Sequence, residues 1–385
     1  MKRGEITDSI PSDLINEICL RLPAKSIARF RCVSKLWGSM LCHPYFTELF
    51  LTRSSAWPRL LFLVAQYPEW LFFSSPQPRN LYDKSSLVLA TDFHIKFSGE
   101  FCQYICSYAS GLLHDKGPMI CNPITGKYAI LPKLKRHKEQ ISFLGFDPID
   151  KQYKVLFMAY PYCNDDNKIL TLGNGKMRWR NIHCPLTHEC FRKGICISGV
   201  LYYVARPISR SYDEGPYVIV CFDVRSEKFK FVDAKFCPRW PLDLVLINYK
   251  GKLGGIILKY ASDGGFPLEL RVWVLEDVEK HEWSKYVYSL WDENKVVKVA
   301  YNLSIAGMTT TCEIILSMKY TSKPYYVYYF NPERNTLRSI EIQGFEECDK
   351  VGGVFAFVDY IEDLNVNDTK QLKSSLLHQG LTKYQ

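Results

Sequence analysis

Two kinds of hydrophobic pattern divide the chain. In residues 12–50, apolar residues recur at spacings of three and four, as in Leu14, Ile18 and Leu22, which is typical of an amphipathic helix. From about Arg59, short runs of Val, Ile, Tyr, Phe and Trp alternate with Gly, Pro, Asn and Asp, which is typical of strands joined by turns. The pattern predicts an α plus all-β chain, with a small helical unit followed by a large β region.

Three short helices are expected in the helical unit. The first begins at Pro11, whose missing N–H costs nothing in a first helical turn, and ends before Pro23. Two more are indicated by two apolar sets, Ile27 with Phe30, and Val33 with Leu36, Trp37 and Met40. Pro44 is expected to close the set. Three short helices bury little surface, so their apolar stripes need a partner, either the rest of the chain or another protein.

The β region contains an internal repeat. In each copy an apolar strand ends at Asn or Asp, a polar turn follows, and an aromatic residue or leucine starts the return strand, because Asx side chains satisfy turn backbone groups. Copies lie at residues 119–128, 220–229 and 329–337, with weaker copies at 170–179 and 272–283. The spacing of about fifty residues suits four-stranded, kelch-like blades. We expect a β-propeller of about six blades, with a pair of β-sandwiches as the alternative.

Residues 9–50 resemble an F-box along nearly their whole length, including Ile10-Pro11, Arg21-Leu22-Pro23 and the run from Arg29 to Lys35. The resemblance implies docking on the Skp adaptor of a Skp–cullin–F-box (SCF) ubiquitin ligase, and through it on a cullin. By resemblance, the adaptor-binding motif consists of Ile10, Pro11, Leu14, Ile18, Leu22, Pro23, Ile27, Phe30, Val33 and Trp37. The sequence does not separate the residues that touch the adaptor from those that hold the helices together.

The β region resembles the plant F-box-associated domain of the kelch-like type 3. The matching segments are residues 120–123, 143–148, 221–225, 273–277 and 330–332. The resemblance implies that this domain recruits a protein target for ubiquitination.

The resulting division of the chain has five parts. We expect an N-terminal segment at 1–8, the F-box at 9–50, a linker at 51–58, the propeller-like domain at 59–361 and a polar, disordered tail at 362–385.

Charge and composition narrow the range of partners. The formal net charge of +9 invites a nucleic-acid partner, but the basic clusters at 133–138 and 176–180 are short, irregular and typical of solvated loops, so we do not expect one. The apolar run at 60–65 is too short to cross a bilayer. The 14 cysteines follow no secretory signal, so we expect reduced thiols and a location in the cytoplasm, the nucleus or both.

No motif indicates catalysis or a cofactor. His183, Cys184, His188 and Cys190 lie close together, but adjacent residues of a strand point to opposite faces and no Cys-x-x-Cys pair exists, so we expect no metal site. Phosphate-binding loops and hydrolase signatures are absent from the sequence. The sequence therefore predicts a non-catalytic ligase subunit without cofactors.

Target contact is expected on loops of one propeller face. The candidates are Tyr160, Asp165, Arg206, Arg210, Tyr212, Tyr260 and Phe266. The sequence does not name the target. The alternative function is a stand-alone β-scaffold for protein or ligand binding, without a ligase role, in which the helices serve only as a cap.

Overall fold

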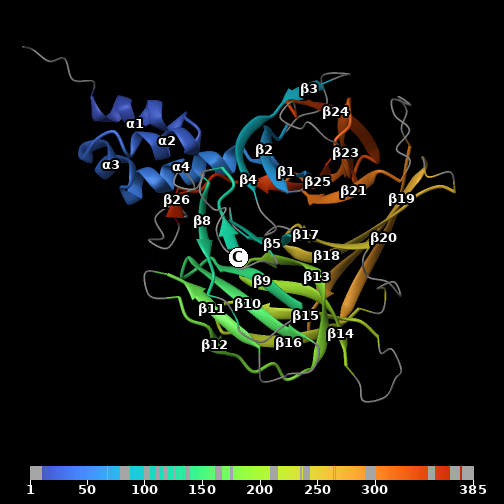
Figure 1. Ribbon diagram of the computed structural model, residues 1–385. Helices are drawn as coiled ribbons and strands as arrows, with labels where there is room; N and C mark the ends of the chain where they lie inside the picture. Colours follow the sequence, from blue (N-terminus) through green and yellow to red (C-terminus); the bar gives the residue numbers. More distant parts are fainter. Residues whose placement is uncertain are drawn as a thin grey trace, which may run out of the picture.

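The computed structural model describes most of the chain in ordered elements (Figure 1). The described residues are 11–66, 68–78, 87–98, 105–109, 112–115, 119–124, 126–132, 134, 139–160, 167–173, 177–208, 216–234, 236, 243–262, 264, 266–291, 301–345, 352–364 and 373–374.

Four helices, rather than the three expected, form the helical unit at one end of the molecule (Figure 1). They are α1 (Ser12–Leu20), α2 (Ala24–Phe30), α3 (Lys35–Leu41) and α4 (Pro44–Ala56). The expectation that Pro44 closes the set is wrong. Pro44 occupies the first turn of α4, where a proline is tolerated, and the helix continues through most of the expected linker.

The strands of the β region form six sheets. The first contains β25 (Gly353–Tyr360), β1 (Arg59–Gln66), β2 (Glu69–Pro76) and β4 (Asp92–Ser98). The next contains β26 (Lys373–Ser374), β8 (Lys127–Ile130), β7 (Met119–Cys121), β6 (Leu112–Asp115) and β5 (Ile105–Ala109). The third contains β12 (Arg180–Asn181), β11 (Lys168–Leu172), β10 (Gln152–Tyr160) and β9 (Glu139–Asp147).

The remaining three sheets continue around the ring. One contains β13 (His188–Ile197), β14 (Val200–Pro207), β15 (Val218–Asp223) and β16 (Lys228–Asp233). Another contains β17 (Leu244–Tyr249), β18 (Lys252–Lys259), β19 (Leu268–Asp277) and β20 (Glu282–Leu290). The last contains β21 (Leu303–Met308), β22 (Ile314–Met318), β23 (Tyr325–Asn331), β24 (Thr336–Gln343) and β3 (Leu87–Ala90), which pairs with β24 in parallel.

The β-propeller is confirmed, and the β-sandwich alternative is wrong. Five of the sheets form blades rather than the six expected. In the remaining sheet every strand has five residues or fewer, and β5 packs against both β9 and β13 instead of starting a full blade. The first blade is closed by β25, which comes from the far end of the domain and pairs with β1.

The repeated hairpins have the Asx turns that the sequence predicts. The side chain of Asp223 accepts a hydrogen bond from the Ser226 N–H at 2.6 Å, and the side chain of Asn331 accepts one from the Glu333 N–H at 3.0 Å. Asn122 does the same for the Ile124 N–H at 3.1 Å. Each Asx side chain therefore satisfies a backbone donor at the point where the chain reverses.

The helical unit shares a hydrophobic core with the propeller. Ile27, Leu41 and Phe50 belong to one buried cluster with Leu61 of β1 and Phe72 of β2. The chain after β25 joins this cluster as well, because Leu364 is completely buried in it. Leu364 and strand β26, which pairs with β8, therefore belong to the structured part of the chain although they fall in the segment expected to be disordered, and residues 365–372 and 375–385 lie outside the described residues.

The described part of the chain contains no helix that is long and apolar enough to cross a membrane.

Candidate functional site

Helix α1 has an apolar side that the protein itself does not cover. Leu14 and Ile18 are separated by one helical turn, so they lie on the same side of α1, and each is 55% exposed. Cys19 on the other side is buried, and Ile15 is partly buried against the same cluster. Helix α1 therefore packs with one apolar side and leaves a second one in solvent.

The α2–α3 connection and the first turn of α3 also expose apolar side chains. Val33 is 66% exposed and Leu36 is 76% exposed. The segment is held in place by Arg31, whose guanidinium donates to the Leu41 carbonyl oxygen at 2.7 Å, and by Ser34, whose hydroxyl caps α3 by accepting from the Trp37 N–H at 3.2 Å. These bonds fix the backbone that presents the two apolar side chains.

We define the docking surface as Leu14, Ile18, Val33 and Leu36. These residues come from α1 and from the α2–α3 region, which lie at the end of the molecule remote from most of the sheets (Figure 1). Several large apolar side chains that remain exposed on one small structured unit commonly mark a protein contact. Leu36 was not among the predicted site residues. Its spacing from Val33 and Met40 indicated a helix but did not indicate that its side chain is exposed.

The predicted adaptor-binding residues divide into two groups. The exposed members are Pro11, Leu14, Ile18, Pro23 and Val33, the partly buried ones are Leu22, Phe30 and Trp37, and Ile27 is fully buried. Ile10 lies outside the described residues. Phe30 and Trp37 stack with their ring centroids 5.2 Å apart, so their role within the chain is to hold α2 on α3.

Polar contacts fasten the inner side of the helical unit to the propeller. The Glu362 carboxylate accepts a hydrogen bond from the Ala24 N–H at 2.7 Å, and the Glu362 N–H donates to the Ser54 hydroxyl at 2.8 Å. The Lys25 ammonium donates to the His94 carbonyl oxygen at 2.8 Å. Burial raises the pKa of Glu362, whereas the hydrogen bond from Ala24 opposes that shift. One carboxylate thus joins the first turn of α2 to the chain leaving the last strand of the first blade.

Replacing Glu362 by alanine is expected to destabilise this contact by about 1–3 kcal/mol, because the buried Ala24 N–H would lose the carboxylate oxygen that accepts its hydrogen bond. Glu362→Gln keeps an acceptor oxygen at the same position and should cost less than half as much. Urea denaturation of both variants measures the difference. Equal losses for the two variants would contradict the role of this hydrogen bond.

The predicted target-binding residues are not assembled into one site by the described part of the structure. Arg206 on β14 forms an ion pair with Glu189, and the Tyr260 hydroxyl donates to the Leu303 carbonyl oxygen at 2.7 Å. Phe266 packs against the largest core cluster. Asp165, Arg210 and Tyr212 lie outside the described residues, as does the side chain of Tyr160, whose backbone ends β10.

Three members of the His–Cys group of the sequence, Cys184, His188 and Cys190, are buried in a blade, whereas His183 is exposed. His188 Nε2 lies 3.1 Å from the Tyr203 hydroxyl, and its Nδ1 lies 2.8 Å from the Leu186 carbonyl oxygen. Burial raises the pKa of Cys184 to about 11, which leaves its thiol protonated at neutral pH. Among the described residues, no three His, Cys, Asp or Glu side chains gather in a way that could hold a metal ion.

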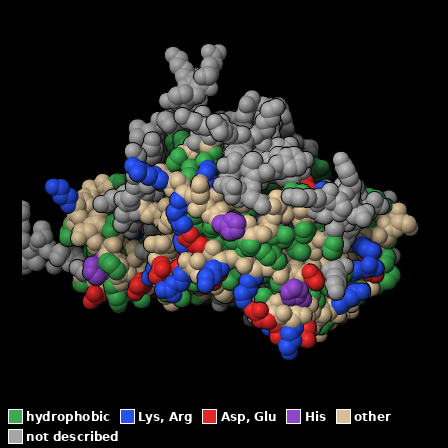
Figure 2. Space-filling view, turned by 90° about the horizontal axis from the view of Figure 1, so that it is seen from below, with side chains coloured by type: hydrophobic (Ala, Val, Ile, Leu, Met, Phe, Trp, Pro, Cys, Tyr) green, Lys and Arg blue, Asp and Glu red, His purple; other side chains and the backbone are tan. Residues whose placement is uncertain are grey.

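The basic side chains of the propeller that the structure describes are largely paired with carboxylates. Lys154 lies 2.7 Å from Glu227, which also pairs with Arg180, and Lys250 lies 2.9 Å from Glu333. Figure 2 shows Lys and Arg side chains interspersed with Asp and Glu on the face that it presents. Residues 133, 135–138 and 176 of the two basic clusters lie outside the described residues.

Comparison with known proteins gives matches along most of the chain. Residues 8–49 match the F-box domain, and residues 59–361 match the F-box associated beta propeller domain. The putative F-box protein At5g42430 of Arabidopsis thaliana is 57% identical over 375 residues, which cover 95% of this chain and 93% of that protein. The F-box protein At3g57590 of the same plant is 54% identical, with 96% of this chain and 94% of that protein covered.

Proposed function

Because the chain belongs to the F-box proteins that carry an F-box associated β-propeller domain, we propose that it is a substrate-recognition subunit of an SCF ubiquitin ligase. In this role the F-box at residues 9–50 docks on a Skp-type adaptor, and through it on a cullin. The domain at residues 59–361 holds a protein target. In this proposal the protein acts in the cytoplasm, the nucleus or both.

The docking surface is the observation that carries this proposal. Leu14, Ile18, Val33 and Leu36 are exposed, although the opposite side of the same helices is buried in a core shared with the propeller. An uncovered apolar surface on a rigidly seated unit is suited to a partner that buries it.

The proposed mechanism is to bring the target close to the ubiquitin-conjugating enzyme. An adaptor held by the helical unit and a target held by the propeller raise the local concentration of target lysines near the charged conjugating enzyme. The shared core supports this mechanism, because it fixes the helical unit against the propeller and so limits the range of distances between adaptor and target. The chain itself performs no chemical step in this scheme.

Affinity capture of the full chain with the proteasome blocked tests the proposal. We expect the Skp-type adaptor and a cullin among the captured proteins, together with ubiquitinated proteins that disappear when the docking surface is altered. Capture of partners without adaptor or cullin would instead support the alternative of a stand-alone β-scaffold.

A further inference from the structure

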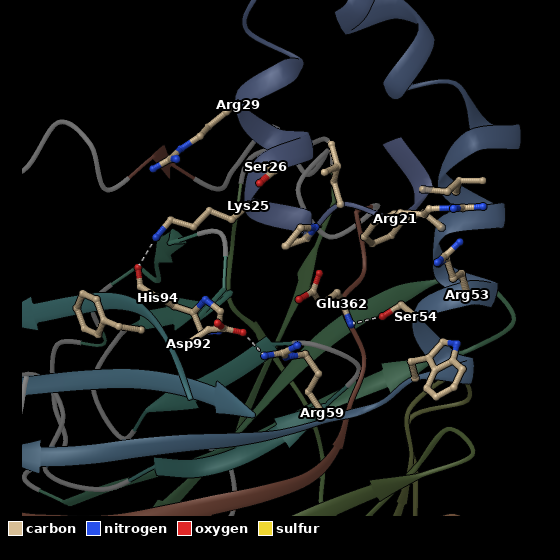
Figure 3. A pocket seen from close by; sticks show the side chains of 16 residues that line it. Arg21, Lys25, Ser26, Arg29, Arg53, Ser54, Arg59, Asp92, His94 and Glu362 are labelled. Carbon is tan, nitrogen blue, oxygen red and sulfur yellow. Dashed lines mark hydrogen bonds and ion pairs between the residues drawn. The ribbon is translucent and has the colours of Figure 1, made fainter. Parts of the chain in front are cut away.

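A pocket of about 480 Å³ lies between the helical unit and the propeller. One wall comes from the end of α1, from α2 and from α4, and the other from the start of β1, from β4 and from Glu362. Figure 3 shows Arg29 and Lys25 on one side of the pocket, Arg21 and Arg53 on the opposite side, and Arg59 below them. The docking surface lies elsewhere, because none of its residues lines this pocket.

The pocket carries an excess of positive charge. Five cationic side chains line it, which are Arg21, Lys25, Arg29, Arg53 and Arg59, whereas only Asp92 and Glu362 are acidic. Asp92 pairs with Arg59, and the Glu362 carboxylate accepts the Ala24 N–H. Arg21 pairs outside the pocket lining with Glu17 at 2.9 Å.

Three of these cations lack a carboxylate partner among the residues that the structure describes. Lys25 donates only to a backbone carbonyl oxygen, that of His94, and Arg29 and Arg53 form no ion pair with any described residue. Their charges therefore add up across the pocket, and an anion placed between them would be attracted from both sides.

The pKa values of two residues in the pocket lining are consistent with this excess of positive charge. Burial, together with the charges of Arg59 and Lys25, lowers the pKa of His94 to about 4, so its ring is neutral at pH 7. Burial and the charge of Arg29 also lower the pKa of Lys25. Burial, the larger cause of both shifts, disfavours a charge of either sign, whereas the smaller contribution of the neighbouring cations opposes a further positive charge and has the sign that attracts an anion.

We propose that this pocket binds a small phosphorylated molecule at the junction of the helical unit and the propeller. Guanidinium groups bind phosphate through paired, charge-assisted hydrogen bonds, and a lysine adds a point charge. The volume falls in the range of small-molecule pockets, about 300–1,000 Å³. A ligand here contacts Lys25, Arg29 and Arg53 of the helical unit and Arg59 of the propeller, so its binding stabilises their docked arrangement. This inference goes beyond the adaptor role and does not rest on it.

Calorimetric titration of the full chain with sodium pyrophosphate tests the proposal, with ionic strength held constant by sodium chloride. We expect saturable binding at one site and a rise in the melting temperature. Arg29→Gln and Arg53→Gln are each expected to weaken binding about tenfold or more, because each removes a charge-assisted hydrogen bond. Both side chains are exposed, so the melting temperature without ligand should stay close to that of the wild type.

Arg178→Gln is the matched control, since Arg178 is exposed and lies outside the pocket lining. It should bind pyrophosphate like the wild type. Absence of saturable binding, or an equal loss in the Arg178→Gln variant, would overturn the proposal. A phosphoserine peptide that binds more tightly than pyrophosphate with the same dependence on Arg29 and Arg53 would overturn the assignment to a small molecule.

Discussion

Replacing Leu14 and Ile18 together by aspartate is expected to weaken adaptor binding at least ~100-fold. The two side chains share one side of α1, and a carboxylate placed in a desolvated apolar contact loses its hydration without gaining a partner. Both positions are 55% exposed in the free chain, so stability should change by no more than about 1 kcal/mol. Calorimetry with a purified Skp-type adaptor measures the affinity, and thermal unfolding measures the stability.

Val287→Asp is the control for this double variant. Val287 is 51% exposed on β20, the outer strand of its sheet, which lies on the side of the propeller away from the helical unit (Figure 1). The same replacement of an apolar residue by an acidic one should leave adaptor affinity unchanged at this control position. Adaptor binding that survives in the Leu14→Asp/Ile18→Asp variant would show that the docking surface is not where the adaptor contacts the chain.

Replacing Phe50 by alanine is expected to cost about 3–5 kcal/mol of unfolding free energy. Phe50 of α4 is 3% exposed and belongs to the cluster that joins the helices to β1 and β2, so its loss leaves a cavity at the junction. Adaptor binding should persist below the lowered melting temperature, because the docking surface is untouched. Equilibrium urea denaturation followed by tryptophan fluorescence measures the loss.

Tyr45→Ala is the comparison for Phe50→Ala, because Tyr45 lies on the same helix and is 63% exposed. It should cost at most about 0.5 kcal/mol. A Phe50→Ala variant as stable as Tyr45→Ala would mean that the helical unit is not held to the propeller through the shared core.

The general architecture could be predicted from local sequence. Asx residues at the ends of apolar runs predicted the hairpins, because each side chain satisfies a backbone donor only a few residues away, as Asp223 does for Ser226. The helical periodicity predicted α1 to α3. Pro44 misled the prediction of the fourth helix, since proline both stops a helix and starts one, and position alone does not distinguish the two.

Features that depend on distant segments could not be predicted. Ala24 and Glu362 are 338 positions apart, and nothing in either local sequence indicates their hydrogen bond. The apolar residues of α1 have similar chemistry, but the structure buries Cys19 and leaves Ile18 exposed because only one side of α1 packs against α4 and the shared core. The short strands β5 to β8 also carry the repeat signature in part, although they do not form a full blade.

Hydrogen–deuterium exchange of the full chain, with and without a Skp-type adaptor, tests the central claim most directly. If the adaptor covers the docking surface, backbone amides of α1 and of the segment from Val33 through α3 should exchange at least ~10-fold more slowly in the complex. Amides of β1 and β2, which lie beneath the helical unit, should remain unchanged. Unchanged exchange in α1 and α3, or protection confined to the propeller, would contradict the account.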